Sequence, residues 1–186
     1  MRLLILADID DLHWVHGTGQ ADVLLSCGGA YDGLILEAAR RFNCSKLFAV
    51  KGDNDFDEPF PPPIIDLHLR VERHGDVTFG GLNASWRYKP RGFVAEQDGA
   101  KLMLAGFPPV DVFVSHNSPR DVHHTEDETR FGFEALNEYI SRAKPRLLVH
   151  GHQHVNKETT VGTTRVIGVY GYRVLEFAEH ASIAGT

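Results

Sequence analysis

Short apolar runs alternate with polar loops along the first half of the chain. Arg2 to Ala7 and Ala21 to Cys27 are nearly continuous apolar runs, which is typical of strands covered on both faces. A helix is expected from Asp32, which can cap it, to Phe42, because apolar residues recur there at helical spacing. Lys46 to Val50 is a further apolar run. This succession predicts a sheet with helical cover.

The second half of the chain continues the alternation. We expect a hairpin, a helix, a strand, a helix, a strand and two or three short strands, over residues 67–79, 94–105, 110–115, 133–140, 147–150 and 157–177. The hairpin should turn at Gly75, between flanking polar residues. The pattern as a whole predicts an α/β protein.

Composition narrows the class of protein. A chain of 186 residues, with 42% hydrophobic and 24% charged residues, fits a single globular domain over residues 1–186. Its net charge of −6 argues against broad binding to nucleic acid or anionic lipid. No segment approaches the length of a membrane span, and two cysteines form no motif. We therefore expect a cytoplasmic protein.

Polar residues with ligand chemistry follow the predicted strands. In order along the chain they are Asp8 and Asp10, the pair Gly28-Gly29, Asp53, His116, and the pair His152 and His154. Ligands collect at the carboxyl ends of strands in open sheets, so these positions can converge. Mixed aspartate and histidine ligands suit Mn, Fe, Zn or Ni. Any one of these residues could cap a turn or sit in the core, but the joint pattern favours a metal site.

The order of these motifs, ending in Gly151-His152-Gln153-His154, resembles the calcineurin-like metallophosphoesterases over nearly the whole chain. The resemblance implies a four-layer αββα sandwich with two metal ions and hydrolysis of phosphomonoesters or phosphodiesters. It also implies two ligand sets, which are Asp8, Asp10 and His154 for one ion and Asp53, His116 and His152 for the other.

Four positions depart from the family pattern. Asp10 and Asn54 stand where the family has histidines, Gly29 stands where it has the aspartate that bridges the metals, and Asp53 replaces an asparagine. The carboxylates can still bind metal, whereas Gly29 cannot. Asn54 occupies the position of a catalytic histidine, but an amide does not give up a proton near neutral pH.

The count of carboxylates bears on whether the site is rearranged or decayed. Asp8, Asp10 and Asp53 supply three carboxylates, whereas the family pattern supplies two. One or two divalent ions would therefore meet ample negative charge without the bridge, which favours a rearranged site over a decayed one.

Other polar residues admit two interpretations. Arg87 and Tyr88 lie in a basic, aromatic loop that could contact substrate or could be plain surface. His123 and His124 lie in a polar stretch, residues 120–129, that could overhang the site and is expected to be a surface loop. His150, inside a strand run, is expected to be a hydrogen-bonded structural residue.

The sequence thus predicts a metal-dependent hydrolase that acts on a small phosphorylated substrate by attack of a metal-bound hydroxide. The alternative is a catalytically impaired protein of this fold that works as a binding scaffold, as the retromer subunit of the family does. Six surviving ligand candidates favour catalysis, because a scaffold has no need of them. Substrate and oligomeric state stay open.

Overall fold

The first of two large sheets contains the N-terminal strands. The computed structural model describes residues 1–9, 18–124 and 126–179. In this sheet the strands lie in the order β13-β1-β2-β3-β4, with bounds Gly171–Glu176, Arg2–Ala7, Val23–Ser26, Lys46–Ala49 and Ile64–Asp66. β1 to β4 run parallel to one another, and β13 pairs antiparallel with β1.

The second large sheet has six strands. Their order is β11-β12-β10-β9-β6-β5, with bounds Lys157–Val161, Thr164–Gly168, Leu147–His150, Val112–Ser115, Val77–Leu82 and Val71–His74. The four inner strands are parallel, and the two edge strands are antiparallel to their neighbours.

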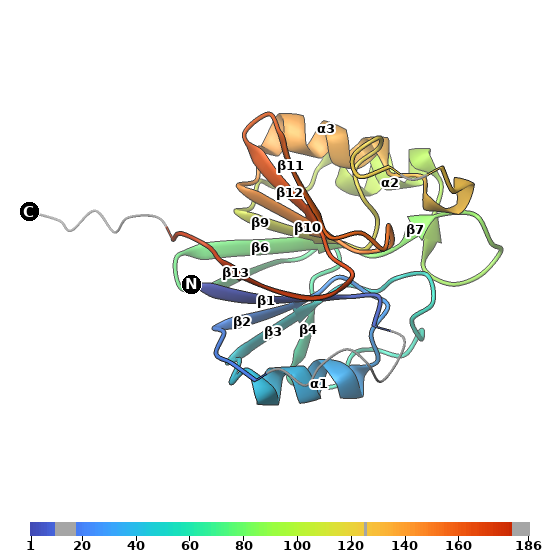
Figure 1. Ribbon diagram of the computed structural model, residues 1–186. Coiled ribbons are helices and arrows are strands. Elements are labelled where there is room, and N and C mark those ends of the chain that lie inside the picture. The colour runs from blue at the N-terminus through green and yellow to red at the C-terminus, as the bar shows by residue number, and fades with distance from the viewer. Residues whose placement is uncertain (10–17, 125, 180–186) are drawn as a thin grey trace, which may run out of the picture.

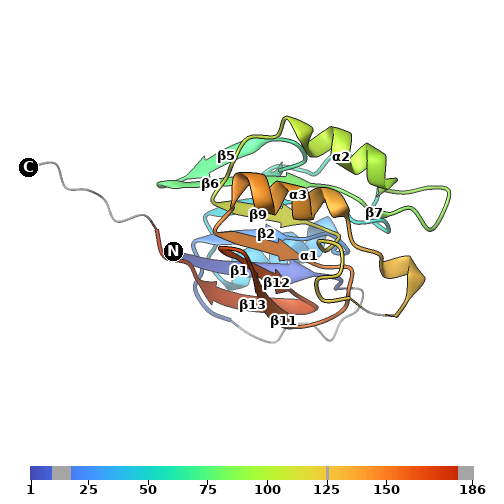
Figure 2. The same cartoon turned by 90° about the horizontal axis from the view of Figure 1, so that it is seen from above.

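Helices cover the outer face of each sheet. Figures 1 and 2 show α1 (Asp32–Arg41) on the first sheet, and α2 (Gln97–Ala105) with α3 (Glu134–Ala143) on the second. The two sheets pack face to face around a shared apolar core, in which the rings of Phe48 and Phe79 lie 4.9 Å apart. The predicted four-layer αββα arrangement is therefore confirmed.

Burial of both faces explains why hydrophobic and polar residues do not alternate along these strands. Every residue of β1 after Arg2 is buried, because one face meets the other sheet and the opposite face meets α1. In the second sheet, Phe113 points toward the helices and packs on Tyr139 of α3, with ring centroids 4.5 Å apart. No helix in the described ranges is long and apolar enough to cross a membrane.

Several local expectations need correction. The helix cap predicted at Asp32 is wrong, because Tyr31 is the N-cap residue and makes no side-chain capping bond. The hairpin strands are β5 and β6, so the first begins at Val71 rather than Leu67. β4 and the small parallel pair formed by β7 (Ser85–Trp86) and β8 (Val94–Ala95) were not expected. These segments are too short to show a hydrophobic period.

The ends of five parallel strands meet at one edge of the sandwich. The loops that follow β1, β2 and β3 lie at this edge. The loops that follow β9 and β10 of the facing sheet lie there too. The 3₁₀ turn η1 (Glu128–Arg130) lies beside the loop that follows β10. The candidate ligands lie on these loops.

Candidate metal centre

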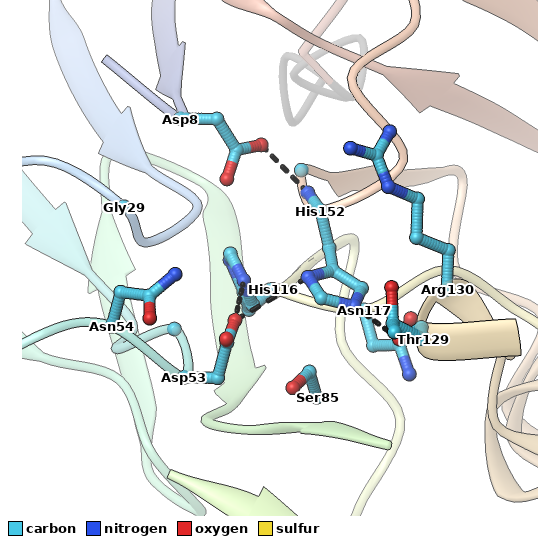
Figure 3. Close-up of polar contacts among 12 residues, drawn as sticks. Asp8, Gly29, Asp53, Asn54, Ser85, His116, Asn117, Thr129, Arg130 and His152 are labelled. Atoms are coloured by element: carbon cyan, nitrogen blue, oxygen red, sulfur yellow. Dashed lines mark hydrogen bonds and ion pairs between the residues drawn. The ribbon is translucent and has the colours of Figure 1, made fainter. Parts of the chain in front are cut away.

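Asp53 lies at the centre of a buried polar cluster between the sheets. Its carboxylate follows β3, and the side chain is 2% exposed. The Nε2 atom of His116 lies 3.0 Å from Oδ1 of Asp53, and the Nδ1 atom of His152 lies 3.4 Å from that same oxygen (Figure 3). Ligand atoms of the three residues all lie within 4.8 Å of one another, which is a spacing that one metal ion can span.

The outer nitrogen of each imidazole is held by a backbone carbonyl. The His116 Nδ1 atom lies 2.8 Å from the Cys27 carbonyl oxygen, and the His152 Nε2 atom lies 3.1 Å from that of Thr129. Because a carbonyl oxygen can only accept, both outer nitrogens must donate a proton. In neutral rings the inner nitrogens therefore carry lone pairs, and both lone pairs face Asp53. Metal-binding histidines are oriented in this way.

Lone pairs facing a carboxylate require a positive charge between them. Burial opposes a charged ring at His116, but the hydrogen bond and the charges of Asp53 and Asp8 outweigh it and raise the pKa of His116 to about 9. Burial likewise opposes the charged carboxylate of Asp53, yet its bonds with both histidines hold its pKa well below the usual range. A proton satisfies this cluster in the protein alone. A divalent cation fits this cluster better, because it can bind the lone pairs of both inner nitrogens and of the carboxylate oxygen at once.

A second pair lies beside this cluster. His154 Nε2 is 3.7 Å from Oδ1 of Asp8, and Oδ2 of Asp8 accepts a hydrogen bond of 2.7 Å from the His152 backbone N–H. Arg130 Nη2 lies 3.2 Å from His154 Nδ1, and a guanidinium can only donate. In a neutral His154 ring the proton is then on Nε2. This pair therefore needs Arg130 to move before His154 can bind a metal through Nε2.

The backbone at Gly29 excludes the family's bridging aspartate. Gly29 has φ +66°, and a Cβ atom there would lie 2.8 Å from Oδ1 and 2.9 Å from Cα of Asp8. A side chain at this position would therefore displace Asp8 or the loop. Asp10, the other candidate for the Asp8 ion, lies outside the described residues.

Three of the candidate ligands have left-handed backbone conformations. The φ angles are +52° at Asp8, +61° at His152 and +50° at His154. Non-glycine residues adopt this region at a cost of about 1–3 kcal/mol and are concentrated at functional sites. The three candidate ligands therefore share a backbone feature that is concentrated at functional sites.

Comparisons with known proteins address the fold. No family model matches the chain, and no curated protein matches it. A solved structure of the phosphopantetheinyl hydrolase PptH from Mycobacterium tuberculosis matches with a TM-score of 0.58 at 14% identity, covering 90% of this chain and 89% of that one. TT1561 of Thermus thermophilus matches with a TM-score of 0.56 at 14% identity, covering 89% and 88%.

Vps29 from Entamoeba histolytica, in a structure complexed with zinc, matches with a TM-score of 0.53 at 15% identity, covering 97% of this chain and 88% of that one. These are metallophosphoesterase-fold proteins. The chain has the calcineurin-like metallophosphoesterase fold. In this metallophosphoesterase fold the cluster of Asp53, His116 and His152 gathers loops from both sheets at one edge.

Two residues of the basic loop after β7 reach the candidate metal site. The Tyr88 hydroxyl donates to Oδ2 of Asp53, and Lys89 Nζ lies 3.0 Å from the same oxygen. Lys89 also donates to Oδ1 of Asn54 over 2.6 Å. Tyr88 and Lys89 both belong to the basic loop that the sequence offered for substrate contact, although a contact of Lys89 with a candidate metal ligand was not expected. The ammonium group of Lys89 thus stands beside the position of the family's catalytic histidine.

Arg87 points along the small sheet rather than toward Asp53. It forms an ion pair of 3.0 Å with Glu96, and its guanidinium donates to the Val94 carbonyl over 3.3 Å. Arg130, for which the sequence held no signal, is the arginine that contacts a candidate ligand. Its Nη1 atom also donates to the Gln153 carbonyl over 2.9 Å.

His150 and His123 form a buried hydrogen-bonded chain. His150 Nδ1 donates to the Gly151 carbonyl, so its Nε2 accepts from His123 Nδ1 over 2.9 Å. His123 Nε2 in turn accepts from the Thr159 hydroxyl over 3.1 Å. His150 is fully buried, which agrees with a structural role. The surface position expected for His123 is wrong, because that residue is 7% exposed, whereas His124 is exposed.

Proposed function

We propose that this protein is a metal-dependent hydrolase of phosphoesters whose principal ion is held by Asp53, His116 and His152. The observation that carries the proposal is the orientation of the two imidazoles. Each donates its outer proton to a backbone carbonyl and directs its inner nitrogen at the same oxygen of a buried carboxylate. Burial of three polar side chains has an unfavourable desolvation free energy, so packing alone would not favour this arrangement.

A bound divalent ion would neutralise charge on the phosphoryl oxygens and lower the pKa of a water molecule. The chain supplies further positive charge beside it. Lys89 lies on the Asp53 side and Arg130 on the His154 side, so the two cations flank the candidate ligands. Their charges suit the oxygens of a phosphomonoester or phosphodiester. Lys89 is also a proton donor beside Asn54, the position at which the resemblance to the family places the group that protonates the leaving group.

A second ion would use Asp8, His154 and Asp10. We propose that this ion binds more weakly than the first. Gly29 supplies no bridging ligand, and Arg130 competes for the ring of His154. A phosphoryl group that draws Arg130 away would free His154 Nε2 for the metal. Substrate and second ion should therefore bind cooperatively.

The alternative function is a binding scaffold. Gly29 and Asn54 depart from the catalytic pattern, and Leu102 on α2 is 79% exposed on the outer face of the sandwich. A scaffold would use such an outer surface and would not depend on metal. The orientation of His116 and His152 favours the hydrolase, because a scaffold that binds partners through its outer surface does not need two buried imidazoles directed at one carboxylate.

The test combines metal content with hydrolysis. We expect elemental analysis after growth with added Mn or Fe to find at least one transition metal per chain. Aryl phosphates and aryl phosphodiesters should be hydrolysed, and both the metal and the activity should be lost in Asp53→Asn. His74→Gln, on the edge strand β5, is the control. A protein that holds no metal and refuses Mn, Zn and Ni in titration would overturn the proposal in favour of the scaffold.

A further inference from the structure

A cavity extends away from the candidate ligands toward α1. A small hollow of about 120 Å³ is lined by Asp8, Gly29 and His154 together with Tyr31 and Asp55. A larger cavity of about 350 Å³ shares its Tyr31 and Asp55 walls. The two spaces are therefore adjacent, and a molecule whose phosphoryl group lies at the ligands can extend into the larger one.

Aromatic rings form much of the larger cavity. The rings of Tyr31 and Phe56 lie 6.0 Å apart with an interplanar angle of 29°, and Phe60 contributes a third ring. Tyr31 is 58% exposed and Phe56 is 66% exposed. Two large rings that stay in water beside a candidate active centre indicate a surface that a ligand covers.

The same cavity carries an excess of negative charge. Asp32, Asp55 and Glu58 line it together with a single cation, Lys51. The Lys51 ammonium is already engaged, because it donates to the carbonyls of Phe56 and Glu58 and lies 4.6 Å from the Phe60 ring centre. It fixes the loop that carries Phe56 rather than reaching into the cavity.

The pKa of Asp32 agrees with an excess of negative charge in the cavity. Burial raises the pKa of its carboxyl group, Lys51 opposes that rise, and the neighbouring charges of Asp55 and Glu58 add to it. A bound cation would relieve this mutual repulsion. An anionic group would be repelled, and a neutral ring would have no use for the carboxylates.

We propose that this cavity binds an ammonium group, so that the substrate is a phosphoester of an amino alcohol or of its quaternary ammonium form. Aromatic faces attract such cations through the ring quadrupole, and carboxylates beside the rings add direct attraction. The choice of substrate class rests on the proposed hydrolase function. Binding of the ammonium group alone does not.

Binding is tested first, without turnover. Choline and neohexyl alcohol, which has carbon in place of the ammonium nitrogen, are titrated into the full chain by calorimetry, with and without chelator. Choline should bind at least about tenfold more tightly than its uncharged analogue in both conditions. Equal affinity, or no binding of choline, would contradict the proposal.

Variants then locate the site. Tyr31→Ala, Phe56→Ala and Asp32→Asn should each weaken choline binding by about threefold to thirtyfold. Matched controls are Tyr172→Ala, an exposed tyrosine on β13, and Asp98→Asn, which removes the acidic residue from the first turn of α2. Neither control should change the affinity. Choline binding that survives all three cavity variants would place the ammonium site elsewhere and overturn the assignment.

Hydrolysis distinguishes the two proposals. Phosphocholine should be cleaved with a kcat/KM at least about tenfold above that of neohexyl phosphate, and Asp32→Asn should remove most of the preference. If choline binds but neither these two esters nor aryl phosphoesters are cleaved, the hydrolase proposal fails while the ammonium site stands. If both esters are cleaved equally and choline does not bind, the hydrolase stands and the ammonium site fails.

Discussion

At the scale of single residues, Lys89 is a cation that contacts both Asp53 and Asn54. Its Nζ atom lies 3.0 Å from the Asp53 carboxylate and 2.6 Å from Oδ1 of Asn54. It can therefore compete with a metal for Asp53 and can also supply the proton that Asn54 cannot. These two roles predict opposite effects when the charge is removed.

In Lys89→Met, metal affinity should rise severalfold, because a competing cation leaves Asp53. Turnover of alkyl phosphoesters should fall by about 10²–10⁴-fold, whereas aryl esters, whose leaving groups need no proton, should change little. The measurement is kcat against leaving-group pKa for both proteins, beside a metal titration. If kcat depends on leaving-group pKa with the same slope in Lys89→Met and in the parent protein, Lys89 is not the proton donor.

Gly29 is the second residue whose substitution is decisive. In Gly29→Asp, the φ of +66° and the contact with Asp8 should cost about 1–3 kcal/mol of stability. Gly29→Ala carries the same strain without the charge. We expect metal affinity and kcat to fall in both, and further in the aspartate variant, because a second carboxylate then crowds Asp8. Higher metal content and turnover in Gly29→Asp than in Gly29→Ala would instead indicate a decayed site.

At the scale of elements, β10 carries a histidine that cannot be protonated without cost. Burial, followed by the charges of nearby histidines, lowers the pKa of His150 to about 3, although its bond to the Gly151 carbonyl opposes the shift. Burial also lowers the pKa of its partner His123. In the unfolded chain both rings take up protons near the ordinary value of 6.5. The contribution of the neutral His150 ring to stability is therefore fully present above pH 6.5 and is lost as the pH falls toward 3, and the contribution of His123 is lost in the same direction.

The free energy of unfolding should accordingly fall between pH 6.5 and 5, above the range where most carboxylates titrate, by about 1.4 kcal/mol per pH unit for His150. His150→Gln, whose amide can accept from His123, should unfold with a shallower pH dependence. Urea denaturation at several pH values, in the presence of chelator, provides the measurement. An unchanged slope in the variant would mean that His150 does not cause the acid sensitivity.

At the scale of the whole molecule, the candidate metal centre joins the two sheets. Asp53 follows β3 of the first sheet, whereas His116 and His152 follow β9 and β10 of the second. A metal ion bound to all three would be a link between halves that are otherwise held by the apolar core. Binding to the folded state alone must raise stability by mass action.

A free metal concentration of one hundred times Kd should therefore add about 2.7 kcal/mol and raise Tm by about 5–10 °C. Chelator should reverse the shift. In Asp53→Asn the shift should be nearly absent, while in His74→Gln it should be retained. Thermal unfolding of all three proteins with Mn or Zn makes the comparison. An equal shift in Asp53→Asn would place the bound metal outside this centre.

The sequence by itself determined the longer strands and the helices and their order, but not the short strands β4, β7 and β8. Continuous apolar runs such as Arg2–Ala7 are unmistakable because both faces of the strand are buried, and the helical periods of α1 and α3 follow from contact with one sheet face. The motif order at the strand ends was sufficient to predict the fold. It also identified Asp53, His116 and His152 as candidates, because ligands must follow strands in this architecture.

Tertiary structure alone decided which groups face one another. The directions of the His116 and His152 rings depend on the carbonyls of Cys27 and Thr129, which come from other loops and leave no mark in the sequence. The approach of Lys89 to Asp53, and of Arg130 to His154, likewise depends on how loops fold back over the sheet edge. The pattern of hydrophobic and polar residues along the sequence indicates burial and chain direction. Contacts between side chains that are distant in the sequence arise only when the two sheets pack.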